Sequence, residues 1–117
     1  RERKSLSNER TFHENLTSVE EGLVKLDELI EELLDELSGR SDLREIRECV
    51  VKVKFGDFQI TSVQRAADQV EPEMMRELLA EAWERGLGKS VRLIGAGVRF
   101  RSPETEDDLQ LEMFPEA

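Results

Sequence analysis

Apolar and polar residues alternate most clearly at the centre of the chain, in the run Val50–Val63 (VVKVKFGDFQITSV). Apolar residues at every second position of its first arm are separated by Lys52 and Lys54, the period of a strand with one buried and one solvated face. Gly56 and Asp57 favour a tight turn, and an apolar run resumes after them. The pattern predicts a β-hairpin whose outer face is basic.

The region before the hairpin has a helical period instead. Apolar residues recur three and four positions apart, with acids between them: Leu16, Val19, Leu23, Leu26, Ile30, Leu33 and Leu37. Thr17 and Glu20 have the spacing of a capping box, and Gly39 is a usual residue at the end of a helix. This pattern predicts an amphipathic helix over residues 18–38.

The remaining patterns predict one more helix and two more strands. The polar, β-compatible run Lys4–Thr11 predicts a first strand, and Asp42–Glu48 reads as a charged approach to the hairpin. Pro72 suits the first turn of a helix that ends near Gly86. Its apolar stripe consists of Met75, Leu78, Leu79, Ala82 and Trp83. The run Ser90–Arg101 (SVRLIGAGVRFR) predicts the last strand.

The facing of this last strand is ambiguous, because strict alternation places large apolar residues on both sides. A bulge near the run Gly95–Gly97 would let Leu93 and Val98 both point inward, with Arg92 and Arg99 both pointing outward. The sequence alone leaves open whether Arg99 shares a face with Arg92.

Together these elements predict an α+β fold, a single β-α-β-β-α-β domain. We expect a four-stranded, mainly antiparallel sheet with both helices on one face and the other face open. The domain is expected over residues 1–101, with 1–3 as the remnant of a linker from a preceding domain. Residues 102–117 are predicted to form a flexible tail, because their first half is polar and acidic.

Composition narrows the class of protein. A chain of 117 residues suffices for one core. The sequence contains no run of 18 apolar residues, so we expect no membrane partner and a cytoplasmic protein. The single cysteine, Cys49, is expected to be a small buried hydrophobe.

The net charge is −10, yet residues 85–101 contain five cations and no acid. Basic residues are therefore concentrated on the predicted strands, and acidic residues on the predicted helices and tail.

Catalysis by this chain alone is not expected. His13 is the only histidine, so neither a histidine-based triad nor a zinc set can be built, and no phosphate-binding glycine loop is present. The consecutive acids of 106–108 are interpreted as a solvated run rather than as magnesium ligands. We expect no cofactor in this chain.

Two features of the sequence point to binding instead. The open face of the predicted sheet would present side chains of the types that hold phosphates: Lys4, Ser5, Lys52, Lys54, Thr61, Ser62, Arg92 and Arg99. The second feature is the terminal run Gln110–Phe114 (QLEMF), in which an amide precedes two aliphatic residues and an aromatic one. A peptide of this kind can place its apolar side chains in a preformed groove.

These features carry a resemblance that covers essentially the whole chain. The motifs are RKS (3–5) with ERTF (9–12), VKVKFGDFQIT (51–61), GKSVRLIG (88–95) and the terminal QLEMF. In this order and spacing they resemble the little finger domain of the bacterial DNA polymerase IV family, which are Y-family translesion polymerases. The resemblance implies a domain that grips primer-template DNA duplex and docks on the replication sliding clamp.

The resemblance also implies roles for residues. The eight side chains named for the open face become DNA contacts, of which Arg99 is the least secure. The clamp-binding residues are Gln110, Leu111, Met113 and Phe114, with Met113 standing where the family commonly has Leu. Methionine is close to leucine in volume and more flexible, so the pocket is expected to accept it. Magnesium and the catalytic carboxylates belong to the palm of the parent polymerase, which this sequence does not contain.

Three other interpretations stay open at this stage. The hairpin lysines are also typical of ordinary solubilising residues. The helix over 18–38 is nearly an a/d heptad, which would suit a protein-interaction or dimerisation module. A small-molecule sensor would share the fold, although no pocket motif is present. We expect a monomer, because the hairpin needs a helix to cover its apolar face.

Overall fold

The computed structural model describes residues 5–39 and 45–101 of the 117-residue chain. The elements follow one another as β1 (Ser5–Leu16), α1 (Val19–Ser38), β2 (Ile46–Phe55), β3 (Ile60–Ala66), α2 (Pro72–Glu84) and β4 (Val91–Phe100). The predicted β-α-β-β-α-β order is confirmed. Strand β1 continues beyond its predicted end, and β2 already begins within the predicted charged approach.

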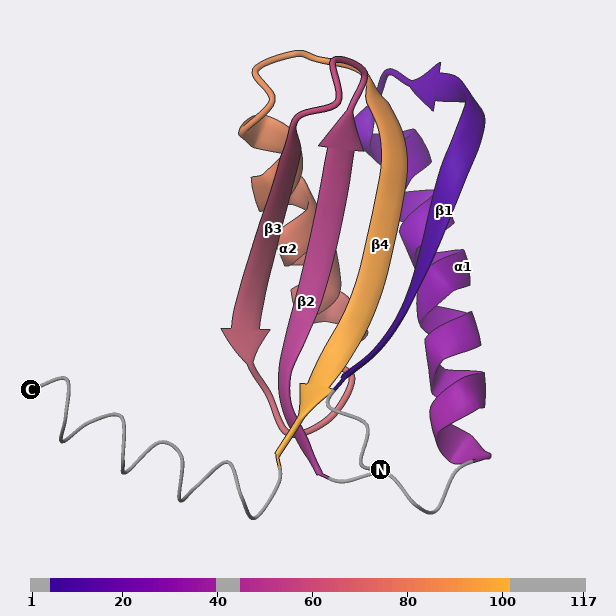
Figure 1. The fold of residues 1–117 in the computed structure, drawn as a ribbon, viewed down its shortest axis with the longest axis vertical. Coiled ribbons are helices and arrows are strands. Elements are labelled where there is room, and N and C mark those ends of the chain that lie inside the picture. The colour runs from indigo at the N-terminus through magenta and orange to yellow at the C-terminus, as the bar shows by residue number, and fades with distance from the viewer. Residues whose placement is uncertain (1–4, 40–44, 102–117) are drawn as a thin grey trace, which may run out of the picture.

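The four strands form one antiparallel sheet in the order β1-β4-β2-β3. Both helices lie on the same side of it, α1 behind β1 and β4 and α2 behind β2 and β3 (Figure 1). The core fills the space between the two layers. The predicted α+β architecture is therefore confirmed, including the sheet face that neither helix covers.

The cap of the first helix lies one residue later than predicted. Ser18 is the N-cap, and its hydroxyl accepts a hydrogen bond from the Glu21 amide. The Glu21 carboxylate accepts one from the Thr17 amide, so the capping box is shifted by one position from Thr17 and Glu20. Leu16, the first residue of the helical pattern, lies instead at the end of β1, opposite Val91, because the strand continues past the point where that pattern begins. The helix ends at Gly39, as predicted.

The stripe of α1 enters the core. Leu26 and Leu33 of the predicted stripe are fully buried, and so is Leu29, which the predicted stripe does not include. The apolar residues of α2 lie beside them. Cys49 is buried in β2 as expected, and its thiol donates a hydrogen bond of 3.5 Å to the Gln69 carbonyl oxygen. Burial raises the pKa of the Cys49 thiol. This environment is that of a small hydrophobe.

Strand register assigns each face of the sheet. Val51 and Val53 of β2 are buried and lie opposite Ala96 and Ile94 of β4, so this set faces the helices. The alternate residues of the strands face away from them, because side chains alternate along a strand. The predicted basic face of β2 is thus the uncovered face.

The bulge in β4 lies earlier than expected. Pairing with β2 is regular from Leu93 to Arg99, and the register shifts between Leu93 and Val91, which leaves Arg92 as the extra residue. Leu93 lies opposite Lys54, on the uncovered face rather than inward. Continued alternation would have turned Arg92 toward the core, and the bulge avoids burying its guanidinium group.

The expectations for residues 1–4 and 102–117 lie outside the described residues. This includes the linker remnant, the tail and the division of the chain at residue 101. In the ranges that the structure does describe, no helix is long and apolar enough to cross a bilayer.

Candidate nucleic-acid interface

Each strand contributes every second side chain to the uncovered face of the sheet, which we call the open face. The register places Thr11, Leu93, Lys54 and Ile60 in one row across it, Glu9, Gly95, Lys52 and Ser62 in the next, and Ser7, Gly97, Val50 and Gln64 in the one after. The row beyond these contains Ser5, Arg99, Glu48 and Ala66. Cations and hydroxyls from four strands therefore share one surface.

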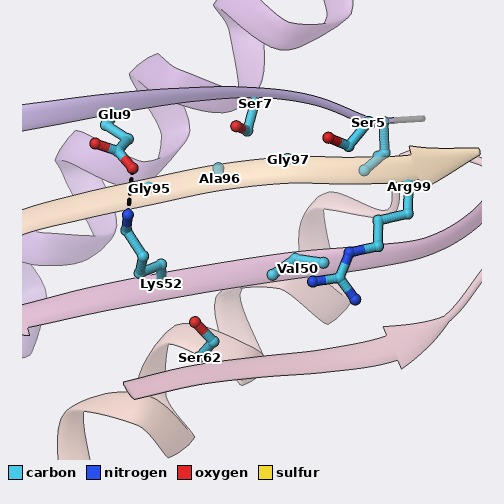
Figure 2. A pocket seen from close by; sticks show the side chains of 11 residues that line it. Ser5, Ser7, Glu9, Val50, Lys52, Ser62, Gly95, Ala96, Gly97 and Arg99 are labelled. Carbon is cyan, nitrogen blue, oxygen red and sulfur yellow. Dashed lines mark hydrogen bonds and ion pairs between the residues drawn. The ribbon is translucent and has the colours of Figure 1, made fainter. Parts of the chain in front are cut away.

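A shallow groove runs along β4 on this face. Its floor contains Gly95 and Gly97, and its walls are formed by Ser5, Ser7 and Glu9 of β1 and by Val50 and Lys52 of β2 (Figure 2). The strands approach closely there, because a Cβ atom built on Gly97 would lie 2.4 Å from the Cβ atom of Ser7. Glycine at this position keeps the groove open and β1 close to β4.

Two cations of the groove are paired with acids on the same face. Lys52 forms an ion pair with Glu9 across β4 (Figure 2). Arg99 donates a hydrogen bond of 2.6 Å to Glu48, whose side chain is only 12% exposed. The two carboxylates offer these cations anionic oxygens, which is the type of acceptor that a phosphate group also offers.

The hairpin end of the open face has a different arrangement. The Arg92 guanidinium carbon lies 4.4 Å from the centre of the Phe58 ring, and the Lys54 ammonium lies 5.3 Å from it. Both distances are within the range of cation–π contacts. Ile60, which faces Lys54 in register, is also exposed. An aromatic residue in contact with two cations therefore lies at the hairpin end of the open face.

The hairpin turn is held by Lys89 from the α2–β4 connection. The Lys89 ammonium lies 2.7 Å from the Asp57 carboxylate and donates a 2.9 Å hydrogen bond to the Gln59 side chain. The hydrogen bond from Lys89 is the main cause that lowers the pKa of Asp57, and the Gln59 amide adds to it. The turn is thus anchored to a second loop.

The structure places most of the sequence-predicted DNA-contact residues together. Ser5, Lys52, Lys54, Ser62 and Arg99 lie on the open face. The bulge adds Arg92 at the hairpin end of this face. The regular pairing of Arg99 with Glu48 of β2 resolves the ambiguity about the face of Arg99.

Thr61 does not belong to this set. It lies opposite Val53, on the helix side of the sheet, and its hydroxyl accepts a 2.8 Å hydrogen bond from Arg85. Alternation along the strand separates it from Ser62. Lys4 and the clamp-binding residues Gln110, Leu111, Met113 and Phe114 lie outside the described residues.

Sequence reasoning missed three residues of this surface. Glu9 was detectable, because the alternation of Ser5, Ser7 and Glu9 places the acid on the face of the serines. The sequence pattern places Glu48 in the charged approach before the strand, and therefore assigns it to neither face of the sheet. The sequence pattern assigns Phe58 only to the turn, because its contact with Arg92 depends on the bulge in a strand more than thirty residues away.

The chemistry that this surface offers is anion binding. No cluster of three or more histidine, cysteine, aspartate or glutamate side chains that could hold a metal occurs within residues 5–39 and 45–101. Cations and hydroxyls on a broad face suit the regularly spaced phosphates of a nucleic acid, and they do not select bases.

Comparison with known proteins places this geometry in a family. The model of the impB/mucB/samB family C-terminal domain matches residues 3–113. The chain is 40% identical over 114 residues to the DNA polymerase IV of Pseudoalteromonas translucida, covering 97% of this chain and 32% of that protein. It is 36% identical over 116 residues to the DNA polymerase IV of a Shewanella species, covering 99% of this chain and again 32% of the relative. The chain thus spans about a third of the curated relatives it matches.

Solved structures agree with this placement. A little finger domain of PolIV, in a complex with the beta-clamp processivity factor, superposes with a TM-score of 0.78 at 27% identity, covering 85% of this chain and 90% of that one. An insertion ternary complex of Dbh DNA polymerase gives a TM-score of 0.68 at 20% identity over 82% of this chain and 28% of the polymerase, a likeness of fold. The chain therefore belongs to the impB/mucB/samB family of C-terminal domains and resembles the little finger domain of DNA polymerase IV.

Proposed function

We propose that this chain is the DNA-binding and clamp-tethering domain of a translesion DNA polymerase. The observation that carries the proposal is the open face, where Lys52, Lys54, Arg92 and Arg99 lie opposite the helical layer of an otherwise acidic domain. An acidic protein that presents four cations on one face attracts a polyanion to that face. The domain would hold the primer-template duplex for a catalytic region elsewhere in the parent protein.

The open face is suited to weak binding without sequence preference. Its donors are the ammonium, guanidinium and hydroxyl groups that contact phosphates and position a protein on DNA. The sheet surface is broad, and no described helix projects from it as a major-groove reader would. Sequence-independent grip is the property that a polymerase moving along any template needs.

Salt dependence tests this proposal directly. If about four phosphates are neutralised, log affinity should fall against log salt with a slope of roughly −4. Fluorescence anisotropy with duplexes of two unrelated sequences measures the slope and the selectivity together. Arg92→Ala should weaken binding and make the slope less steep by about 1. Lys25→Ala, which removes a cation from α1 behind the sheet, should change neither. A salt-independent isotherm or equal effects of the two substitutions would contradict the proposal.

The acids of the groove should restrain DNA binding. Glu9→Gln removes the carboxylate that pairs with Lys52, so this lysine becomes available to phosphate and a repulsive charge disappears. Exposed ion pairs contribute roughly 0.2–1 kcal/mol, so we expect duplex affinity to rise by about two- to fivefold at low salt. Glu31→Gln on α1 removes the same charge away from the face and is the control. Unchanged affinity in Glu9→Gln would show that the pair does not compete with DNA.

The second half of the proposal concerns the terminal run Gln110–Phe114. The relative of known structure that supports it is a little finger domain of PolIV in a complex with the beta-clamp processivity factor, 27% identical to this chain. We propose that Leu111, Met113 and Phe114 fill an apolar groove on the sliding clamp, with Gln110 setting the register through its amide. This assignment is based on the sequence of the run.

The parent activity follows from the same proposal. The relatives are polymerases about three times as long as the matched region, so nucleotidyl transfer and its magnesium ions would belong to other domains of the parent. The expected cytoplasmic location and the monomeric state stay predictions. The alternative of a dimerisation module is not favoured, because the stripe of α1 is buried against the sheet of its own domain.

A further inference from the structure

Phe58 combines an exposed side chain with an unfavourable backbone conformation. Its side chain is 57% exposed, and its φ of 72° lies in the left-handed region. A bulky side chain is rarely found there, because Cβ crowds the backbone, whereas glycine and asparagine adopt it readily. Turn stability alone would therefore favour glycine or asparagine at position 58. Such a conformation at an exposed aromatic residue suggests a role outside the fold.

The contacts of the ring indicate that role. Arg92 lies 4.4 Å and Lys54 5.3 Å from the ring centre. Among the described residues, neither of these cations is within ion-pair distance of a carboxylate. Lys52 and Arg99, the other two cations of the open face, are both paired with acids. The surface thus holds its cations in two ways, with carboxylates in the groove and with an aromatic ring at the hairpin end.

We propose that Phe58 is a positioning residue for DNA binding, an inference that rests on the function proposed above. Its ring orders the side chains of Arg92 and Lys54 at the hairpin end of the open face before the DNA backbone arrives. An aromatic ring attracts cations through its quadrupole and has no net charge. It therefore restricts the two side chains without neutralising them, so they stay available to phosphate and lose less conformational entropy on binding.

The turn around Phe58 is built to keep the ring in place. The Phe58 amide donates a 2.8 Å hydrogen bond to the Phe55 carbonyl oxygen, and the Gln59 amide donates one of 3.1 Å to the Asp57 carboxylate. Lys89 binds the side chains of Asp57 and Gln59 from outside the hairpin. The backbone that carries the ring is thus anchored on both sides of Phe58.

Variants at position 58 test this inference through affinity, salt slope and stability. We expect Phe58→Leu and Phe58→Asn to bind a primer-template duplex about 5- to 10-fold more weakly than the wild type, and Phe58→Tyr to bind within about twofold of it. The salt slope should stay unchanged in all three, because every cation is retained, whereas Arg92→Ala reduces it. Phe58→Asn should unfold at the same or a higher temperature, because asparagine tolerates the left-handed backbone.

A second readout reports the contact itself. In the free wild-type domain, the δ-methylene protons of Arg92 should be shifted upfield by the ring current of Phe58, and Phe58→Leu should abolish the shift. Unshifted Arg92 protons would overturn the inference. Wild-type affinity in Phe58→Leu would overturn it as well and leave the proposed function standing. Failure of the wild-type domain to bind duplex in a salt-dependent manner would overturn both.

Discussion

Replacing Phe114 by alanine is expected to weaken binding to the sliding clamp by about 30-fold or more. Alanine removes the only aromatic side chain of the run Gln110–Phe114, and loss of one such anchor costs on the order of 2–4 kcal/mol. A short peptide of this kind typically binds with about micromolar affinity, near −8 kcal/mol, so about −6 to −4 kcal/mol would remain. Surface plasmon resonance with immobilised clamp measures the loss.

Two controls separate this effect from general damage. Glu112→Ala changes a charged residue inside the same run, and we expect it to leave clamp affinity within about threefold of the wild type, because rim charges contribute little. Phe114→Ala itself should leave the thermal midpoint and the affinity for duplex DNA unchanged. A Phe114→Ala domain that melts several degrees lower, yet binds the clamp normally, would show that Phe114 belongs to the core.

Leu29→Ala is expected to destabilise the domain by about 2–5 kcal/mol, because it leaves a cavity between α1 and the sheet. Leu29 lies in the middle of α1 and is fully buried. Urea unfolding followed by circular dichroism measures the change. Leu34→Ala is the matched control on the same helix: Leu34 is 44% exposed, so its truncation should change stability by no more than about 0.5 kcal/mol.

The same experiment distinguishes a monomer from a helix-mediated dimer. If α1 packs only within its own domain, the unfolding midpoints of the wild type and of Leu29→Ala should not depend on protein concentration. A dimer held by this stripe would become more stable as concentration rises, by mass action. A concentration-dependent midpoint that Leu29→Ala removes would therefore restore the dimerisation hypothesis.

Much of the fold was predictable because the signals are local. Alternation in the run Val50–Val63 and the three- and four-residue spacing from Val19 to Leu37 depend only on neighbouring residues. Turn and cap residues such as Gly39 and Pro72 mark element ends for backbone reasons that also act locally. Errors of one to several residues arose where tertiary pairing extended an element, as in β1, which continues to Leu16.

The composition of the open face was predictable only in part. Lys52 and Lys54 belong to a regular alternation, so their shared face followed from the sequence. Arg92 lies at a bulge, and a single extra residue reverses every facing beyond it, so local periodicity could not assign its side. Thr61 was grouped with Ser62 by proximity in the chain, although adjacent strand residues point to opposite faces.

The sequence by itself determined the order of elements, the amphipathic helices, the basic hairpin and the family resemblance, because these depend on residue type and spacing along the chain. Only the tertiary structure decided which charges meet. The pairing of Lys52 with Glu9, of Arg99 with Glu48 and of Arg92 with Phe58 joins residues that are far apart in sequence and come together through strand order and register. Electrostatic contacts act over a few ångströms in space, so only the folded sheet determines which cations are neutralised and which stay available to a ligand.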